Sequence, residues 1–292
     1  MPHTIHLIDA SPYVFRAYFA LPDMRDPAGR PVSAVYGFAS FLVKYIAEEH
    51  PTHLGVAFDE SLTTSFRNDI YPEYKAQREL PPAELEAQLA ACQAVAKALG
   101  AACFVHDRYE ADDLIGTLAT QLTRKGHDVL VVTPDKDLAQ LVDARVTMFD
   151  YSKGVRYDAA AVRAKFGVAP RQVPDFLGLA GDAVDNIPGV RGIGPKTAAV
   201  LLDAFGDLDA LFRRLDDVAA LPIRGAKTLG AKLAAHRDMA FLSRELATIA
   251  RDAPARADLR ALRLAGADPA LVDPLFEELG FDGIRTRITR WR

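Results

Sequence analysis

The sequence predicts an α/β protein with a mostly parallel central sheet flanked by helices, followed by an all-helical C-terminal region. Short apolar segments alternate with helical patterns over the first 158 of 292 residues, which is typical of parallel strands joined by crossover helices. The segment 128–133 is almost continuously apolar, as expected for a strand covered on both faces. Beyond residue 158 the strand patterns stop, and Gly, Pro and Asp separate short helical segments. We therefore expect two domains, 1–158 and 159–292.

The alternation predicts the elements of the first domain in order. Apolar runs predict clear strands at 5–8, 54–58 and 128–133 and weaker strands at 103–105 and 146–149. Helical patterns between them predict helices at 12–20, 34–49, 84–99 and 110–125. In the second domain we expect helices at 159–166, 197–204, 208–215, 226–236 and 271–279.

Charge and composition narrow the class of protein. Acidic residues outnumber basic ones by 21 to 13 in the first 150 residues, whereas basic residues lead by 22 to 18 in the rest. This balance excludes a protein that coats nucleic acid through overall positive charge, but it allows local phosphate contacts. No apolar run approaches the ~18 residues that cross a bilayer, and the first residues lack a signal-peptide pattern. With only Cys92 and Cys103, we expect a cytoplasmic protein without a zinc site, and nothing requires more than a monomer.

Acidic residues gather where predicted strands end. Since the carboxyl ends of parallel strands meet at one edge of a sheet, we expect these side chains to lie together. A lone Asp at such a position is most often a helix cap, and Asp135 alone fits that interpretation, but capping does not account for acids at four strand ends. The acids in question are Asp9, Asp59, Glu110, Asp112, Asp113, Asp135 and Asp137.

Clustered carboxylates repel one another and are costly to bury without a cationic partner. Oxygen ligands without nearby His or Cys favour Mg²⁺, or Mn²⁺ in its place, over zinc. Two such ions ~3.5–4 Å apart can bind one phosphodiester, one activating water and the other stabilising the leaving oxygen. The number of acids therefore predicts a site for two or more divalent ions and phosphate chemistry.

A polar, aromatic and basic connection follows the second strand, from residue 63 to 82. It contains Arg67, Tyr74, Lys75 and Arg78 without a clear period. Long connections of this kind are often functional, and an ordinary surface loop is the alternative. Beside an acidic cluster, a lysine near a phosphate can stabilise developing negative charge.

A Gly-rich segment at 181–197 is the second informative motif. Gly189 to Gly194 followed by Lys196 and Thr197 is close to a P-loop, but Pro195 intervenes and no strand precedes it, which excludes an NTPase. Three glycines and a proline at the first position of a helix instead predict a helix-hairpin-helix, whose backbone N–H groups hold phosphate without reading sequence. A purely structural turn between two helices is the alternative.

In combination these motifs resemble the bacterial 5′→3′ exonuclease and flap endonuclease family, from Ile8 to about residue 236. The resemblance rests on Phe-Asp at 58–59, Tyr-Lys-Ala-Gln-Arg at 74–78, Tyr-Glu-Ala-Asp-Asp at 109–113, Thr-Pro-Asp-Lys-Asp at 133–137 and the stretch at 181–198. It implies a 5′→3′ exonuclease and 5′-flap endonuclease that uses Mg²⁺ and acts on DNA with a 5′ end, flap or strand junction. Because the chain runs from Met1 to Arg292, we expect a stand-alone member without a polymerase.

The resemblance also implies roles for individual residues. The first metal site would be formed by Asp9, Asp59, Glu110 and Asp112, and the second by Asp112 with Asp135, Asp137 and Asp182; Asp113 and Asp185 would act directly or through water. Lys75 would contact the scissile phosphate, Tyr74 would lie beside the cleaved nucleotide, and Arg16, Arg67 and Arg78 would hold the DNA strand. Backbone contacts to duplex would come from Gly189, Gly192, Gly194, Lys196 and Thr197.

Two larger features complete the expectation from the family. A helical arch would cover about residues 63–99, although Glu79, Glu84 and Glu86 make it only modestly basic. The helix-hairpin-helix, at about 171–205, would bind K⁺ or Na⁺ through backbone carbonyls near 189–193. Two other classes remain as alternatives: a DNA-junction binder of the same fold that does not cut, and a small-molecule phosphohydrolase that uses Asp135 and Asp137.

Overall fold

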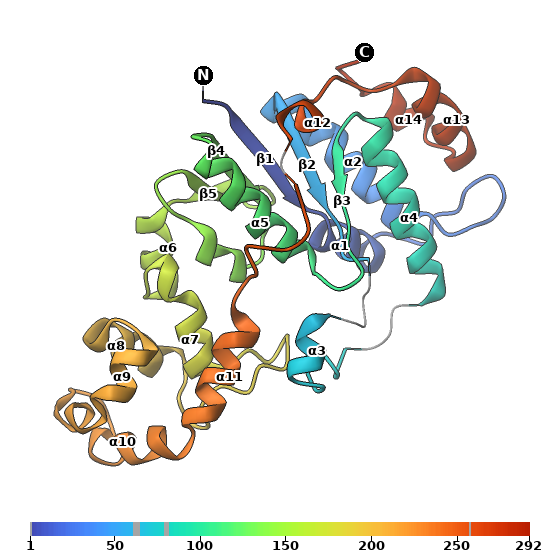
Figure 1. The fold of residues 1–292 in the computed structure, drawn as a ribbon. Coiled ribbons are helices and arrows are strands. Elements are labelled where there is room, and N and C mark those ends of the chain that lie inside the picture. The colour runs from blue at the N-terminus through green and yellow to red at the C-terminus, as the bar shows by residue number, and fades with distance from the viewer. Residues whose placement is uncertain (1, 61–64, 79–81, 257) are drawn as a thin grey trace.

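A computed structural model describes residues 2–60, 65–78, 82–256 and 258–292. Its centre is a six-stranded sheet of order β3-β2-β1-β4-β5-β6, shown in Figure 1. All neighbouring strands are parallel except β6, which pairs antiparallel with β5. The predicted mostly parallel sheet is confirmed. Its strands are β1 (Thr4–Asp9), β2 (His53–Ala57), β3 (Ala102–Phe104), β4 (Asp128–Val132), β5 (Val146–Asp150) and β6 (Val155–Tyr157).

Side chains of β1 alternate between two apolar layers. Ile5 and Leu7 point to the face covered by α5 (Ala111–Arg124), whereas Ile8 points to the face covered by α1, α2 and α4. This alternation is the two-residue period of a strand. Both layers are buried, which accounts for the nearly continuous apolar runs in the sequence. The three helices of the second layer are α1 (Ser11–Ala20), α2 (Ser33–Glu49) and α4 (Ala83–Ala98).

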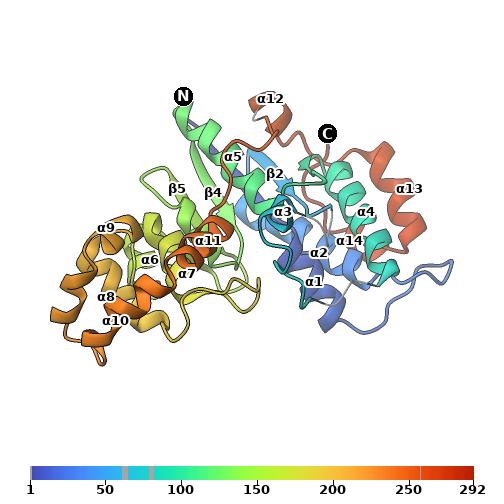
Figure 2. The same ribbon diagram turned by 60° about the horizontal axis from the view of Figure 1, so that its bottom comes forward.

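The helical region has its own apolar core beside the β5–β6 edge of the sheet, as Figure 2 shows. The helices from α6 to α11 enclose this core, and Met148 of β5 and Tyr157 of β6 join it to the sheet. None of the helices in the described ranges is long and apolar enough to cross a bilayer. The region contains α6 (Ala159–Phe166), η2 (Pro170–Gln172), α7 (Val173–Ala180), α8 (Pro195–Phe205), α9 (Leu208–Arg213), η3 (Leu215–Ala220), α10 (Ala226–Ala235) and α11 (Arg237–Ala247), and the 3₁₀ helix η1 (Asp137–Leu141) precedes it.

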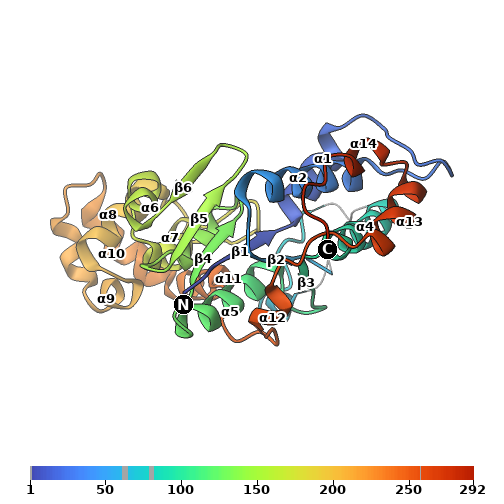
Figure 3. The same cartoon turned by 90° about the horizontal axis from the view of Figure 1, so that it is seen from above.

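The C-terminal segment returns to the sheet, which corrects the predicted second domain of 159–292. After α11 the chain runs along α5, where the Ala253 amide donates to Thr117 Oγ1 (2.9 Å). Leu262 packs into the layer between α5 and the sheet, and Phe276 into the layer on the opposite face. Figure 3 shows α13 and α14 beside α4 and α2, and α12 near α5 and β2, all away from the helical region. They are α12 (Leu259–Leu262), α13 (Pro269–Leu279) and α14 (Asp282–Arg285).

The predicted arch at 63–99 is corrected over its second half. Leu85, Leu89 and Cys92 on one face of α4 are buried against the layer that contains α2, so α4 is a core helix. Its burial follows from an apolar residue at every third or fourth position. Before it, the chain forms the short helix α3 (Phe66–Ile70) and the turns of residues 71–78. Residues 63–64 and 79–81 of the predicted arch lie outside the described residues.

Candidate active site

A small acidic cleft lies at the carboxyl edge of the sheet. It has a volume of about 160 Å³ and collects side chains from the ends of β1, β2 and β4, from the start of α5, from the turn at 71–78 and from the loop after α7. Six predicted metal ligands line it together with Lys75 and Arg78, the two cations that were predicted to contact the DNA strand. The lining residues are Asp9, Ser11, Pro12, Phe15, Asp59, Lys75, Arg78, Glu110, Asp112, Asp135 and Asp185.

Hydroxyl and backbone donors hold the acids that follow the strands. Thr133 Oγ1 donates to Asp9 Oδ2 (2.9 Å), and the Ser11 amide donates to Asp9 Oδ1 (3.2 Å). Ser11 Oγ donates to Asp59 Oδ2 (2.5 Å), whose other oxygen accepts from the Ala111 amide (2.8 Å). One serine therefore connects the carboxylates of Asp9 and Asp59, and the start of α5 is bonded to Asp59.

Burial and mutual repulsion raise the pKa values of several carboxyl groups in and beside the cleft. Desolvation, followed by the charges of Asp59 and Asp135, raises the pKa of Asp9 well above its ordinary value. Desolvation and the charge of Asp9 do the same to the pKa of Asp112. Burial and Asp135 raise the pKa of Asp137 to about 8. Within the described residues, the buried Oδ1 of Asp137 has no hydrogen-bond partner. These are the signs of an acidic site built for a cation.

Three cationic side chains pair with acids around the cleft. Lys75 Nζ lies 2.8 Å from Glu110 Oε2 and 3.8 Å from Asp185 Oδ2. Arg78 pairs with Asp185 (2.6 Å) and Lys136 with Asp182 (2.6 Å). Burial alone would lower the pKa of Lys75, but the charge of Glu110 and its neighbours holds it well above the ordinary value, so the lysine is charged. In the described ranges, no three His, Cys, Asp or Glu side chains are close enough to share one ion.

Arg67 and Asp113 form a buried pair, which corrects two predictions. The Arg67 guanidinium donates to both carboxylate oxygens of Asp113 (2.8 and 2.9 Å) and to the carbonyls of Leu246 and Thr248. Asp113 also accepts from the Ala250 amide (2.8 Å) and is fully buried, and Arg67 is 3% exposed. Arg67 therefore does not reach DNA and Asp113 is not available to a metal. The pair joins α3, α5 and the segment after α11.

Tyr74 is also placed differently from the prediction. Only 3% of the residue is exposed, and its ring packs into the apolar core of the helical region. The hydroxyl donates toward Glu110 Oε2 (3.2 Å) and Asp185 Oδ2 (3.3 Å). The prediction that the Tyr74 ring lies beside the cleaved nucleotide is therefore corrected. The ring is buried, and its hydroxyl is a hydrogen-bond donor to two carboxylates.

The predicted helix-hairpin-helix is present as α7, the loop 181–194 and α8. Gly189 does not offer its N–H to a ligand, because it donates to Ser243 Oγ (2.9 Å). A Cβ at Gly189 would lie 2.3 Å from the backbone N of Gly181, so a close backbone crossing, not DNA contact, requires this glycine. Gly192, Gly194 and Lys196 are exposed and Thr197 is half-buried. They remain available at the start of α8.

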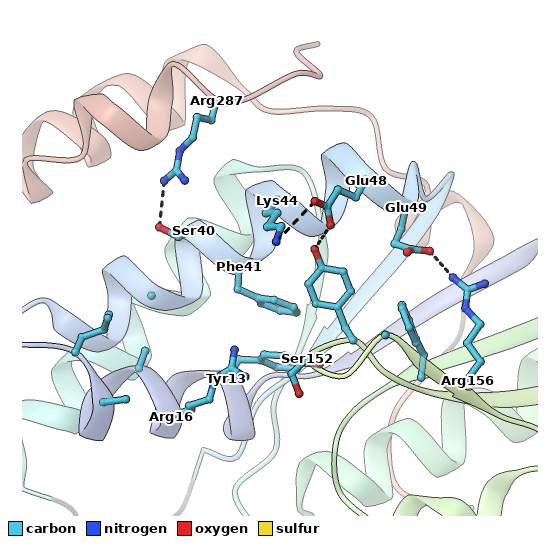
Figure 4. Close-up of a pocket in the computed structure, with 17 residues that line it drawn as sticks. Tyr13, Arg16, Ser40, Phe41, Lys44, Glu48, Glu49, Ser152, Arg156 and Arg287 are labelled. Carbon is cyan, nitrogen blue, oxygen red and sulfur yellow. Dashed lines mark hydrogen bonds and ion pairs between the residues drawn. The ribbon is translucent and has the colours of Figure 1, made fainter. Parts of the chain in front are cut away.

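Arg16 lies outside the acidic cleft. Ser11, Pro12 and Phe15 face the cleft, whereas Tyr13 and Arg16 face a groove of about 820 Å³ on another side of α1. Figure 4 shows this groove, with Arg16 on α1, Arg287 in the C-terminal segment, and Arg156 paired with Glu49 at the β6 end. A DNA contact by Arg16 would therefore be made across α1 from the carboxylates.

Sequence reasoning missed several residues that hold the site in place. Lys136 lies between two predicted ligands, and its position in Thr-Pro-Asp-Lys-Asp was a usable signal. Ser11 follows Asp9 by two residues, the spacing at which an Asp carboxylate accepts a backbone bond. Ser243 carried no signal, because the 54 residues that separate it from Gly189 leave no local pattern.

Two family models cover most of the chain. Residues 4–167 match the model described as 5′-3′ exonuclease, N-terminal resolvase-like domain. Residues 168–270 match the model described as 5′-3′ exonuclease, C-terminal SAM fold. The chain therefore belongs to the 5′-3′ exonuclease family, whose members are nucleases, and the resemblance drawn from its motifs is confirmed.

Curated relatives are DNA polymerases. The chain is 43% identical over 285 residues to DNA polymerase I of Bacillus caldotenax, and covers 32% of that protein. It is 41% identical over 276 residues to DNA polymerase I of Pseudomonas aeruginosa, and covers 30% of that protein. The chain thus spans about a third of the length of the relatives it matches.

Solved structures share the fold. T5 5′-exonuclease with bound divalent metal ions (zinc) superposes with a TM-score of 0.68 at 20% identity, over 94% of this chain and 98% of the other. The catalytic core of Rad2 in complex with DNA substrate gives a TM-score of 0.65 at 16% identity, over 98% and 92%. At this identity the likeness establishes the fold.

Replacing Arg67 tests its structural role. Arg67→Met leaves the Asp113 carboxylate buried without its cation, and breaking such a pair costs about 3–5 kcal/mol. Urea unfolding should show this loss, whereas Arg108→Met, which breaks the exposed pair with Asp69, should cost no more than about 1 kcal/mol. If Arg67→Met proves as stable as Arg108→Met but reduces the salt dependence of DNA binding, the original DNA-contact interpretation is right.

The raised carboxyl pKa values predict a pH-dependent instability of the metal-free protein. A carboxyl whose folded pKa is raised keeps a proton that the unfolded chain loses, so stability falls as pH rises above the unfolded value of about 3.8 toward the folded pKa. Asp112→Asn should therefore increase the unfolding free energy in EDTA at pH 8, because the neutral amide removes the cost of ionising this buried carboxyl. The gain should vanish near pH 4. The exposed Asp216→Asn is the control, and a loss of stability in Asp112→Asn at pH 8 would contradict the prediction.

Proposed function

We propose that this protein hydrolyses DNA phosphodiesters at or near 5′ ends, as a 5′→3′ exonuclease and 5′-flap endonuclease that leaves 5′-phosphate and 3′-hydroxyl. The observation that carries the proposal is the cleft in which six carboxylates meet Lys75 and Arg78. Family membership supports the reaction class, and the DNA complex of the Rad2 core supports DNA as the substrate of this fold. The protein is proposed to act as a monomer.

The donor set fits Mg²⁺, with Mn²⁺ as a substitute. The cleft is lined by carboxylates and contains no His or Cys among the described residues, which suits hard divalent ions that prefer oxygen. Asp137 Oδ1 is buried and has no hydrogen-bond partner in the part of the chain that the structure describes, as expected for an oxygen that binds a ligand. We assign one proposed ion to Asp9, Asp59, Glu110 and Asp112, and the other to Asp112, Asp135, Asp137 and Asp182, with Asp185 beside them. Because no three described side chains are close enough to share an ion as they stand, these carboxylates would have to draw together when the ions bind.

Bound divalent ions would supply an activated water and charge stabilisation at the leaving oxygen. The cationic side chains of the protein would also stabilise negative charge on the phosphate. Lys75 and Arg78 now neutralise Glu110 and Asp185, and a phosphate that enters the cleft offers them a second anionic partner. Their charge would favour the extra negative charge that develops on the phosphate during attack. Tyr74, which donates to the same two acids, would keep the carboxylates in place.

The hairpin is proposed to position the duplex. The α8 N-terminus begins at Pro195, preceded by the exposed Gly192 and Gly194 and followed by the exposed Lys196. Free N–H groups and the positive end of the helix dipole suit a phosphate. These contacts read no bases, so we propose recognition of DNA structure and not of sequence. A monovalent cation near 189–193 is part of the same proposal.

Removing one ligand tests the metal site. Asp135→Ala should lower the turnover of a 5′-flap duplex in Mg²⁺ at least about a hundredfold, the scale of losing one electrostatic group in an active site. DNA affinity, measured by fluorescence anisotropy, should change less than about threefold, because the proposed duplex contacts are made by Gly192, Gly194 and Lys196 and not by Asp135. Wild-type protein that binds the flap but never cuts it would indicate a junction binder. Hydrolysis of a chromogenic phosphate ester without DNA cleavage would indicate a phosphohydrolase.

Removing one hairpin charge tests the DNA surface. Lys196→Ala should weaken duplex binding and reduce the slope of log affinity against log salt by about 1, the value for one lost phosphate contact. Lys97→Ala removes another exposed charge, on α4 at the other side of the molecule (Figure 1), and should leave the slope unchanged. Equal slopes for wild type and Lys196→Ala would show that the hairpin does not contact the DNA through Lys196.

A further inference from the structure

Two polar residues outside the acid set connect the turn that carries Lys75 to the loop that carries Asp185. Gln77 Nε2 donates to the carbonyls of Ala183 (3.0 Å) and Val184 (2.9 Å). From the opposite side, Asn186 Nδ2 donates to the carbonyl of Glu73 (2.6 Å). We call this contact between residues 73–78 and 183–186 the clasp.

The clasp surrounds a backbone bond that places Lys75. The Lys75 amide donates to the Asp185 carbonyl (3.0 Å), between the bonds made by Gln77 and Asn186. The turn and the loop are more than 100 residues apart in the chain, so tertiary contacts such as these bonds and the Arg78–Asp185 pair fix their relative position. With the backbone held there, the Lys75 side chain reaches Glu110 (2.8 Å).

The backbone at the clasp is in an unusual conformation. Lys75 has φ of +56° and Asn186 has φ of +55°, and in the described part of the chain His50 is the one other non-glycine residue with positive φ. Asn tolerates this left-handed region, whereas a long side chain such as Lys does not favour it. Such strain persists when surrounding contacts hold it, and it concentrates at functional sites. The bonds of Gln77 and Asn186 are contacts of this kind.

We propose that Gln77 and Asn186 are positioning residues that set the Lys75 ammonium group over the acidic cleft. Neither residue lines the cleft, so each acts through the backbone of residues 73–78. The clasp also makes the position of Lys75 depend on the loop that leads into the hairpin, so the proposed DNA-binding surface and the cleft share one support. The effect on turnover rests on the proposed function, whereas the structural effect does not.

The first test separates positioning from folding by a double-mutant comparison in the 5′-flap assay. Gln77→Ala should lower kcat about tenfold with KM changed less than about threefold, since a displacement near 1 Å can cost up to a hundredfold. Gln77→Glu keeps the size but loses the N–H donors, and should be equally impaired. In a Lys75→Ala background, adding Gln77→Ala should cost less than about twofold, because its effect passes through Lys75. A full, additive loss in that background, or unchanged kcat in both Gln77 variants, overturns the proposal.

The second test requires no cleavage. Asn186→Gly keeps the left-handed backbone available and removes only the bond to Glu73. This variant and Gln77→Ala should both speed hydrogen exchange at the Lys75 amide at least about tenfold, while amides in the core helix α4 keep their wild-type rates. Unchanged protection of the Lys75 amide overturns the proposal. If both variants show the expected faster exchange but the wild-type protein does not cut DNA, the nuclease function is rejected and the clasp remains supported.

Discussion

The repulsion between buried carboxylates is the constraint on which this structure depends. Asp9 and Asp112 are desolvated and lie within range of each other's charge, and the rise in their pKa values shows the cost. The fold limits that cost with cations brought from separate segments to one sheet edge. Lys75 comes from the turn after α3, and Lys136 follows β4. The sheet edge, the turn and the loop after α7 are therefore joined by these ion pairs.

The exposure of the paired cation distinguishes acids that stabilise the fold from acids that a ligand can reach. Arg67 is 3% exposed and meets Asp113 with two hydrogen bonds, so this pair is permanent. The Lys75 side chain is 21% exposed and that of Lys136 is 45% exposed, so solvent and incoming ligands reach them. An acid paired with a reachable cation can exchange that partner for a metal or pass the cation to a phosphate. Sequence motifs do not show this difference, because Asp112 and Asp113 are adjacent and chemically identical.

The sheet and the composition of the cleft were predictable from sequence, because burial on both faces and the strand-end position leave local patterns. The acids at 9, 59, 110, 112 and 135 line the cleft as expected. Short or polar elements were missed: β6 has three residues, two of them exposed, and α11 buries small side chains such as Ala240 and Ser243. The pairing of Arg67 with Asp113 and of Gln77 with residues 183–184 depends on contacts across 46 and more than 100 residues. No local pattern records such contacts.

Because the C-terminal segment returns to the sheet, the helical region is an insertion in the sheet domain and not a separate C-terminal domain. The helical region is inserted between the strand β6 and the segment that follows α11, so it is attached to the sheet body by two chain crossings. Ile249 and Leu262 complete the layer over α5. A protease cut near residue 247 would thus not release two autonomous modules. Removal of the residues after 247 would uncover part of the apolar layer over α5, and the shortened polypeptide would be prone to self-association.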